Sequence, residues 1–321
     1  MDTQPHDAPQ PNDPDRVAVV IPVYNGQAHL AECLESVLAQ GPIVHEVIVA
    51  DDGSTDATPT IIDTFAARDA RFTGIRMPNS GGPAAPRNRG AAASSCEWIA
   101  FVDSDDVWAP GKLVTQMGAL RADPGLVAVG GIARYLGTRG PMSGIFGAPP
   151  STETWDEVAA GRTMPFQVAS TVVVRRSAFE AIGGFDESLP ASEDLDFIAR
   201  LCATGRIGCV TDEVAYYRLR RDSLIGANYR TLILMPRFIA ARIAARRNGS
   251  DLSIEQFDAF DRITIGERRT VIGGRAFRNT AVDIAERRWG RLSLDATCAV
   301  GLTPLRTVRR LREKVRVRPR H

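Results

Sequence analysis

Residues 17–53 read VAVVIPVYNGQAHLAECLESVLAQGPIVHEVIVADDG, and this stretch decides the fold. Its segments 17–23 and 46–50 are short, dominated by apolar residues and rich in β-branched side chains, as in strands buried on both faces. Between them, apolar residues recur at helical spacing before a Gly-Pro pair ends the helix. A strand, a helix and a second strand joined by short loops predict a mostly parallel central sheet flanked by helices.

The same alternation continues downstream. We expect strands at 71–76, 98–102, 126–130 and 167–174, a helix at 193–201, and a loop rich in Gly, Pro, Ser and Thr at about 138–164. Beyond residue 225 the pattern becomes helical, for example at 237–246 and 277–289. The sequence therefore predicts a disordered polar tail at 1–15, an α/β domain at 16–225 and a helical C-terminal appendage at 226–321.

The composition argues against several functional classes. The 321 residues carry a formal net charge of +1 and contain no recognised nucleic-acid-binding motif, so nucleic acid is not an expected partner. The five cysteines are scattered and the four histidines form no pair at ligand spacing, which argues against disulfides and zinc. No run of 18 apolar residues occurs, so we expect no transmembrane helix and a cytoplasmic location.

The end of the chain is strongly basic. Eight Arg or Lys residues lie between 306 and 320, opposed only by Glu313. One interpretation is a solvated helix face, and the other is peripheral contact with anionic lipid at the inner face of the membrane. The excess of arginine is general, because only Lys112 and Lys314 are lysines, and this composition favours the first interpretation.

Polar residues follow the predicted strands at the points where they end. They are Tyr24-Asn25, Asp51-Asp52, Asn79 and Asp103-Ser104-Asp105. Ligands of open parallel sheets bind outside the carboxyl ends of the strands, and all four groups fall at that edge. We therefore expect a binding site there.

The segment 103–106, DSDD, places three carboxylates directly after an apolar strand. Backbone alternation puts Asp103 and Asp105 on the same side, where two hard oxygen ligands suit Mg²⁺ or Mn²⁺ together with a substrate diphosphate. The alternative is a solvated turn, and in either case we expect Asp106 to cap the following helix.

A second acidic segment follows the strand at 46–50. Asp51 and Asp52 exceed what capping requires, and a carboxylate there can accept a hydrogen bond from a base or a ribose. Asp56 is a plausible N-cap of the next helix. A metal for the diphosphate and an acceptor for the nucleoside together indicate a nucleotide.

Five segments in fixed order carry a family resemblance. They are 17–25, which ends in IPVYN, 46–56 (EVIVADDGSTD), 103–106 (DSDD), 183–187 (GGFDE) and the pair Glu193-Asp194. Together they resemble the GT-A glycosyltransferases of family 2, over about residues 17–225. The resemblance implies a Rossmann-like GT-A fold and an inverting, metal-dependent transfer from a nucleotide-diphosphate sugar, commonly a UDP-sugar.

The resemblance also implies residue roles. Pro22 and Tyr24 would line the nucleoside pocket, Asp52 or Asp51 would contact the base, Asp103 and Ser104 would face the ribose or the metal, and Asp105 would bind the metal. Asp194 would be the general base, with Glu193 orienting it or the acceptor, and Asp196 would be structural. Without the family, Glu193 and Asp194 would be read as stabilising a helix N-terminus.

The segment 79–88, NSGGPAAPRN, is similar to wall-teichoic-acid N-acetylglucosaminyltransferases of this family. That similarity implies nucleotide contacts for Asn79 and Arg87, whereas the alternative leaves Arg87 on the surface. Arg220 or Arg221 would close over the diphosphate, or else form a surface cluster. Trp108 and Trp155 are candidates for stacking on sugar, although Trp108 is equally suited to the core.

The resemblance thus implies transfer of a sugar to a hydroxyl of a cell-envelope glycan, a polymer or a lipid-linked glycan. Two other functional classes use similar sequence features. A sugar-nucleotide nucleotidyltransferase would prefer a glycine-rich basic loop after the first strand, but residues 22–26 contain no basic residue. A non-catalytic nucleotide-sugar-binding relative would be expected to have lost one of Asp103, Asp105 and Asp194, and all three are present.

Overall fold

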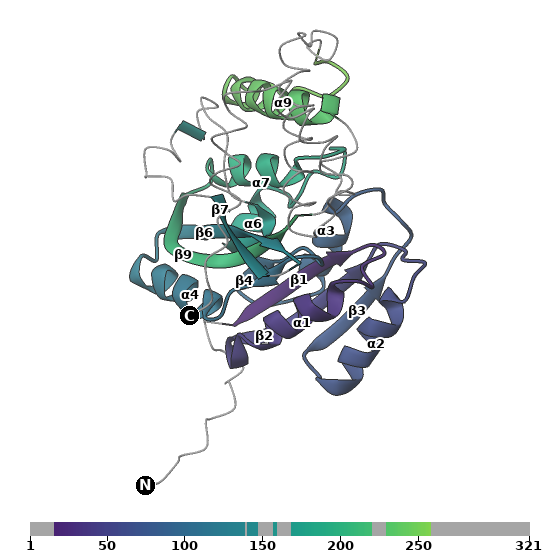
Figure 1. Ribbon diagram of the computed structural model, residues 1–321. Coiled ribbons are helices and arrows are strands. Elements are labelled where there is room, and N and C mark those ends of the chain that lie inside the picture. The colour runs from purple at the N-terminus through teal and green to yellow at the C-terminus, as the bar shows by residue number, and fades with distance from the viewer. Residues whose placement is uncertain (1–15, 139, 147–156, 159–167, 220–228, 258–321) are drawn as a thin grey trace.

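The computed structural model describes residues 16–138, 140–146, 157–158, 168–219 and 229–257. Within them, nine strands form one sheet in the order β3-β2-β1-β4-β8-β6-β9-β5, with β7 paired to β6 (Figure 1). The first half is parallel and comprises β1 (Val17–Val23), β2 (Val44–Asp51), β3 (Phe72–Arg76) and β4 (Trp98–Phe101). The expected strands of residues 17–102 are confirmed.

The second half of the sheet is mixed. It comprises β5 (Val107–Trp108), β6 (Leu126–Gly137), β7 (Gly140–Phe146), β8 (Val173–Arg175) and β9 (Arg206–Arg218). Strand β8 is antiparallel to both β4 and β6, whereas β6 and β9 are parallel. The α/β class and the mostly parallel central sheet are as predicted.

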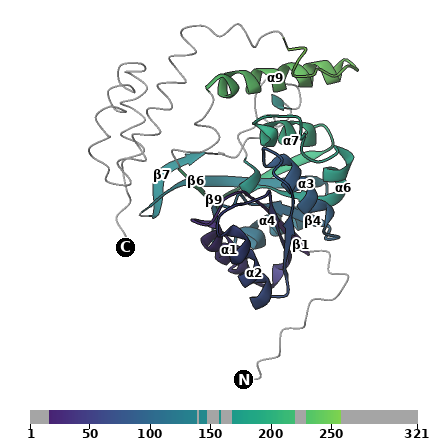
Figure 2. The same ribbon diagram turned by 90° about the vertical axis from the view of Figure 1, so that its right-hand side faces the viewer.

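Helices cover both faces of the sheet, and Figure 2 shows the layers edge-on. One apolar cluster joins the sheet to α1 (Leu30–Leu38), α2 (Thr58–Arg68) and α4 (Lys112–Ala122). The other joins it to α3 (Ala84–Ala92), α6 (Arg176–Ala181), α7 (Glu193–Leu201) and α9 (Tyr229–Arg247). Short 3₁₀ turns lie at Gly41–Ile43 and Ala169–Thr171. Helix α9 forms an outer layer over α7.

One close contact sets the position of α3 on the sheet. Gly90 packs on β1 so tightly that a Cβ atom there would lie 2.5 Å from Cγ1 of Val20. Only glycine permits this approach. The neighbouring residue Arg87 is thereby brought close to the carboxyl end of β4.

Two expectations about the second half are wrong. The expected loop 138–164 contains β7, because Gly and Pro are tolerated in a strand that pairs with β6 alone. The expected strand 167–174 is instead the 3₁₀ turn at Ala169–Thr171 followed by three strand residues. The buried side chain of Ser170 explains this difference, because in the turn its hydroxyl can donate a hydrogen bond to Asp106.

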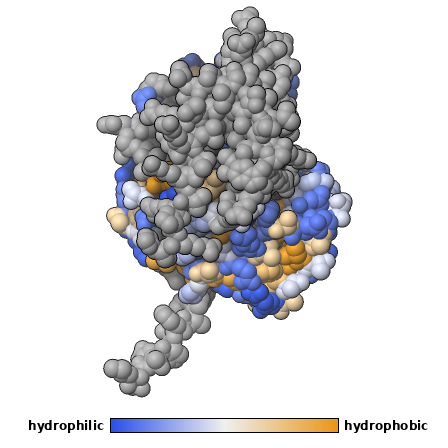
Figure 3. Space-filling view, viewed as in Figure 1, coloured by the Kyte–Doolittle hydropathy of each residue, from blue (hydrophilic) through white to orange (hydrophobic). Residues whose placement is uncertain are grey.

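The helix expected at 193–201 is confirmed as α7, and the helix at 237–246 lies within α9. The tail 1–15, the segment 277–289 and the basic stretch 306–320 lie outside the described residues. No helix in the described part combines the length and apolar character needed to cross a membrane. The described surface on the face in Figure 3 is mostly hydrophilic, with hydrophobic residues interspersed near α1 and α2.

Candidate active site

The loops after β1 and β2 are joined by hydrogen bonds. The side-chain oxygen of Asn25 accepts from the Thr55 N–H at 2.8 Å, and the Asn25 N–H donates to Ser54 Oγ at 2.8 Å. Asn25 has a φ of 50°, which asparagine tolerates better than most residues. These contacts fix the loop that carries Tyr24, whose side chain is 53% exposed, whereas Pro22 is buried within β1.

Asp51 and Asp52 are both buried and both hold backbone groups. Asp51 accepts a hydrogen bond from the Ser54 N–H at 2.9 Å. Asp52 accepts the Ser80 N–H at 2.8 Å, and its carbonyl accepts from Nδ2 of Asn79 at 2.9 Å. The structure therefore brings Asp52 and Asn79 together, while the predicted base contact stays a prediction for both aspartates.

The centre of the site is a buried cation. Arg87, 2% exposed, donates from one terminal nitrogen to Asp103 at 2.5 Å and from the other to Glu193 at 2.6 Å. Burial opposes the charge of Arg87, but the two carboxylates raise its pKa above its ordinary value. The alternative of a surface Arg87 is wrong, because α3 lies close against β1 and buries this side chain.

Asp194 lies beside this ion pair, in the first turn of α7. Burial and the charge of Glu193 raise the pKa of Asp194 to about 7, against the opposing effect of Arg87. A carboxylate with a pKa near neutrality is suited to take up a proton at physiological pH. Glu193 itself is committed to Arg87, which separates the roles of the two adjacent acids.

The loop that carries the DSDD segment is fixed by hydrogen bonds from Ser170 and Arg218 to Asp106. Asp106 accepts from Ser170 Oγ at 2.6 Å and from the backbone N–H of Arg218 at 3.0 Å. Burial, with the nearby charges of Asp105 and Asp103, raises the pKa of Asp106 well above its ordinary value. The prediction that Asp106 caps the next helix is wrong, because α4 begins only at Lys112 and Asp106 turns inward.

Asp103 and Asp105 are partly exposed at the end of β4, and their predicted role as metal ligands stays a prediction. The backbone N–H of Asp103 donates to Ser170 Oγ at 3.0 Å, and Nε of Arg218 donates to the Asp105 carbonyl at 2.8 Å. The side chain of Ser104 lies near Gly26. Among the described residues no group of three His, Cys, Asp or Glu side chains is arranged to hold a metal. The two carboxylates fit Mg²⁺ or Mn²⁺ if a substrate diphosphate completes the ligand shell.

Two sequence motifs meet through Asn88. Its amide nitrogen donates to the Phe185 carbonyl and to Glu187, both at 2.8 Å, and its oxygen accepts the Phe185 N–H at 2.8 Å. Gly184, with a φ of +70°, packs so close that a Cβ would lie 2.5 Å from the Asn88 oxygen. The segments 79–88 and 183–187 are thus two parts of one structure.

Other predicted residues fall into two groups. Trp108 belongs to the core, where its indole N–H donates to the Ser170 carbonyl at 3.0 Å. Asp56 accepts a hydrogen bond from the N–H of Thr58, the first residue of α2. The N-cap position itself is Ala57, so Asp56 binds a free N–H of the helix start from the residue before the N-cap. Arg220, Arg221 and Trp155 lie outside the described residues.

Sequence reasoning missed three residues of the site: Ser170, Arg218 and Tyr217. Burial and the charges of the DSDD carboxylates raise the pKa of the Tyr217 phenol well above its ordinary value, which places Tyr217 beside that segment. The pattern Tyr-Tyr-Arg at the end of a strand was a visible signal for two of them. Ser170 carries no local signal.

Comparisons with known proteins identify relatives of this chain. The profile of glycosyl transferase family 2 matches residues 18–183, and that of glycosyltransferase like family 2 matches residues 156–234. A pre-mycofactocin glycosyltransferase of Mycobacterium tuberculosis is 32% identical over 59% of this chain and 39% of its own length. A poly(ribitol-phosphate) beta-glucosyltransferase of Bacillus spizizenii is 27% identical over 64% of this chain and 33% of its own. The chain thus spans about two fifths of these relatives or less.

Solved structures share the fold. S. aureus TarS 1-349 in complex with UDP-GlcNAc has a TM-score of 0.56 at 19% identity, covering 94% of this chain and 93% of that one. The complex of TarS 1-349 with UDP has a TM-score of 0.52 at 18% identity, covering 95% of this chain and 94% of that one. These likenesses support the GT-A fold. Since the first profile covers more than half of the sequence, the chain belongs to glycosyl transferase family 2.

Proposed function

We propose that this protein transfers a sugar from a nucleotide-diphosphate sugar, a UDP-sugar, to a hydroxyl acceptor with inversion at the anomeric carbon. The observation that carries the proposal is the ion pair of Arg87 with Asp103 and Glu193. It joins the end of β4, suited to a metal and a diphosphate, to the start of α7, where a carboxylate has a pKa of about 7. The UDP and UDP-GlcNAc complexes of TarS favour UDP as the nucleotide.

In this reaction Asp194 takes the proton of the acceptor hydroxyl as the oxygen forms a bond to the anomeric carbon. The bond between that carbon and the diphosphate oxygen breaks, and the electron pair leaves with the diphosphate. Glu193 and Arg87 hold the base side of the site, and Tyr24 borders the nucleoside side. The inverted product follows from attack on the face opposite the leaving group.

A divalent cation held by Asp103 and Asp105 would neutralise the leaving diphosphate. Arg87 already pairs with Asp103, so that carboxylate is held in place before any cation binds. Asp105 reaches the same edge on a loop tied down by Arg218. Binding of UDP with each metal in turn distinguishes Mg²⁺ from Mn²⁺.

For the acceptor we propose a chemical class and no single compound. The poly(ribitol-phosphate) beta-glucosyltransferase relative favours a cell-envelope polymer, and a lipid-linked glycan is the other candidate. We place the reaction in the cytoplasm, where nucleotide sugars are made, with residues 16–225 as the catalytic domain. For the basic stretch 306–320, the general excess of arginine favours a solvated face, with contact to the inner face of the membrane as the alternative.

The test is calorimetric binding of UDP with and without Mn²⁺ or Mg²⁺, followed by UDP release from a panel of UDP-, GDP- and dTDP-sugars. We expect the metal to tighten UDP binding, and Asp105→Asn to remove that increase. Asp63→Asn on the exposed face of α2 is the matched control and keeps it. Binding of no nucleotide sugar in the presence of metal refutes the proposal, and binding without any turnover favours the non-catalytic alternative.

A further inference from the structure

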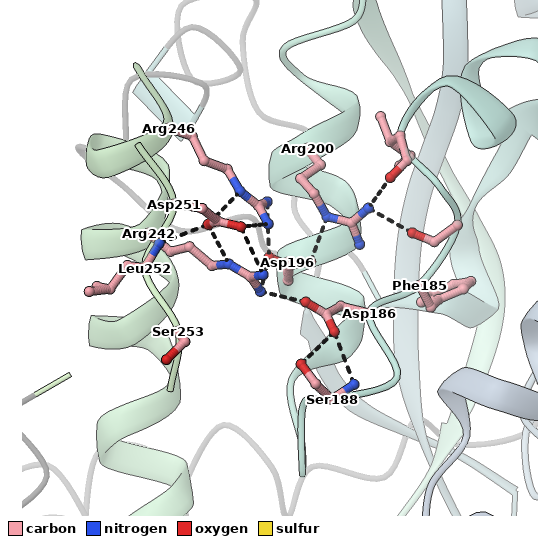
Figure 4. A network of polar contacts seen from close by, with 12 residues as sticks. Phe185, Asp186, Ser188, Asp196, Arg200, Arg242, Arg246, Asp251, Leu252 and Ser253 are labelled. Atoms are coloured by element: carbon pink, nitrogen blue, oxygen red, sulfur yellow. Dashed lines mark hydrogen bonds and ion pairs between the residues drawn. The ribbon is translucent and has the colours of Figure 1, made fainter. Parts of the chain in front are cut away.

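Helix α9 is joined to the catalytic side of the molecule by six charged residues, which we call the α7–α9 ion network. Figure 4 shows its members, Asp186, Asp196, Arg200, Arg242, Arg246 and Asp251. They come from the GGFDE segment, from α7, from α9 and from the turn after α9. None of them belongs to the site described above, yet α7 carries both Glu193 and Asp194.

Arg242 contacts all three acids of the network. It donates to Asp186 at 2.5 Å and to Asp251 at 3.0 Å, and it lies 3.8 Å from Asp196. The pKa of Arg242 is raised, because these carboxylates outweigh the opposing effect of burial. Arg242 thus connects the GGFDE segment, α7 and the outer layer of the fold.

Asp196 is the point where this network reaches α7. Its side chain is 2% exposed, and it accepts from Arg200 at 2.6 Å while Arg242 and Arg246 each approach to 3.8 Å. Arg200 also donates to the carbonyls of Ile182 and Gly184, both at 2.7 Å. A carboxylate surrounded by three cations from two elements has little freedom to move. Asp196 lies two residues after Asp194 on the same helical turn.

The residue at the N-cap position of α7 provides no side-chain hydrogen bond to the helix. Ser192, the residue before the helix, has a φ of 61° and makes no capping hydrogen bond through its side chain. The first turn is held on one side by the contact between Arg87 and Glu193. Within the turn the Asp194 carboxylate accepts the Leu195 N–H at 2.8 Å, and the ion network at Asp196 adds the contact that comes from α9.

Apolar packing keeps α9 on α7 independently of these charges. Met235, Phe238 and Ile239 of α9 share one apolar cluster with Phe197 and Ile198 of α7. Apolar contact is non-directional, whereas ion pairs with hydrogen-bond geometry fix orientation. Loss of Arg242 should therefore leave the helices packed but allow α7 to shift or rotate.

We propose that Arg242 is a positioning residue for the proposed base: through Asp186 and Asp196 it fixes the first turn of α7 and so the orientation of the Asp194 carboxylate. This inference rests on the proposed function. It assigns to α9 a part in the chemistry, although no described side chain of α9 belongs to the site. Small displacements matter because a general base must lie within hydrogen-bond reach of the proton it takes.

The experiment compares full-length wild type with Arg242→Met, Arg242→Lys and Asp186→Asn. Arg68→Met, which breaks the exposed 2.7 Å pair with Glu35 on the other side of the sheet, is the matched control. The readouts are UDP release in the presence of Mn²⁺, with water as acceptor, from UDP-glucose, UDP-galactose or UDP-N-acetylglucosamine, and calorimetric binding of UDP. Thermal unfolding reports the folded fraction.

We expect Arg242→Met to lower kcat about 10- to 100-fold while the donor KM and the UDP Kd stay within about twofold. Arg242→Lys should recover part of kcat, because one ammonium can still reach Asp186. The double variant with Asp186→Asn should fall no further than Arg242→Met, since both changes break the same contact. Arg68→Met should match wild type.

An unchanged kcat in folded Arg242→Met overturns the inference, and so does a loss explained entirely by a smaller folded fraction. If Arg242→Met does not fold, Asp186→Asn decides in its place, because it removes only one acceptor of Arg242. Failure of the proposed function is a separate result: wild type then neither binds UDP with metal nor releases it, and the inference falls with it.

Discussion

The raised pKa of Asp194 predicts a specific pH dependence. If Asp194 is the base, only its deprotonated form supports transfer, so activity must fall on the acidic side of its pKa. With a pKa of about 7, about one tenth of the molecules are active at pH 6 and about nine tenths at pH 8. In the free protein kcat/KM should therefore rise about tenfold per unit below pH 7 and level off above it. Metal bound at Asp103 and Asp105 would move this rising part of the pH profile, the acidic limb, to lower pH.

The variant Glu193→Gln tests the cause of the shift. The negative charge of Glu193 helps to raise the pKa of Asp194, so its removal should lower that pKa. Two charges about 5 Å apart at an effective dielectric constant near 20 interact by about 3 kcal/mol, which sets an upper limit of roughly 2 pH units. We therefore expect the acidic limb to move down by about 1 to 2 units. Glu180→Gln on the exposed side of α6 is the control and should leave the limb in place.

Asp194→Asn separates the base from other groups. Activity should fall about 10²- to 10⁴-fold, and the acidic limb should disappear. Folding stability gives a second readout. Because the folded pKa exceeds the unfolded value, wild type loses stability as pH rises from about 4 to 7, and above pH 7 the variant should be the more stable protein. An acidic limb that persists in Asp194→Asn, or that moves up in Glu193→Gln, would refute the assignment.

Three further predictions concern the support of the site. Ser170→Ala removes one of the hydrogen-bond partners of Asp106 and the acceptor of the Asp103 N–H; unfolding free energy should fall by about 1–3 kcal/mol and metal-dependent UDP affinity about tenfold, measured by urea titration and calorimetry. Gly184→Ala meets both a positive φ and the Asn88 side chain, and should cost about 1–3 kcal/mol in the same titration. Trp108→Phe should lower the melting temperature but leave the donor KM within about twofold, because this indole packs in the core; a raised KM would restore the sugar-stacking alternative.

Much of the fold was predictable because its strands are buried on both faces. The segments 17–23 and 98–102 bear uninterrupted apolar residues for that reason, and the structure pairs them side by side. Helix α7 was also predictable, since acidic residues precede an apolar stripe. The carboxylates at strand ends were located by the same reasoning, because parallel strands deliver their ends to one edge.

The contacts that organise those carboxylates were not predictable from local pattern. Arg87 and Glu193 are 106 positions apart, and Ser170 and Asp106 are 64 apart. Each pair depends on a packing detail, such as the close approach of Gly90 to β1, that leaves no periodic trace in the sequence. The prediction that Asp106 caps the following helix is wrong for the same reason. An aspartate before a helix satisfies the rule for a cap equally well whether it turns outward or inward.

The charge balance of the site favours binding of the cation before binding of the diphosphate. Asp103, Glu193 and Asp194 surround the single positive charge of Arg87, so this part of the site without its ligands favours a cation over a diphosphate. A metal at Asp103 removes one of the charges that raise the pKa of Asp194, and the base becomes more fully deprotonated as a result. The same residue would thus link donor binding to activation of the base. Because Arg87 contacts both Asp103 and Glu193, this coupling passes through one buried side chain, and Arg87→Met should weaken metal-dependent UDP binding and shift the acidic limb upward together. A variant that changed only one of the two would show that the two ends of the site act independently.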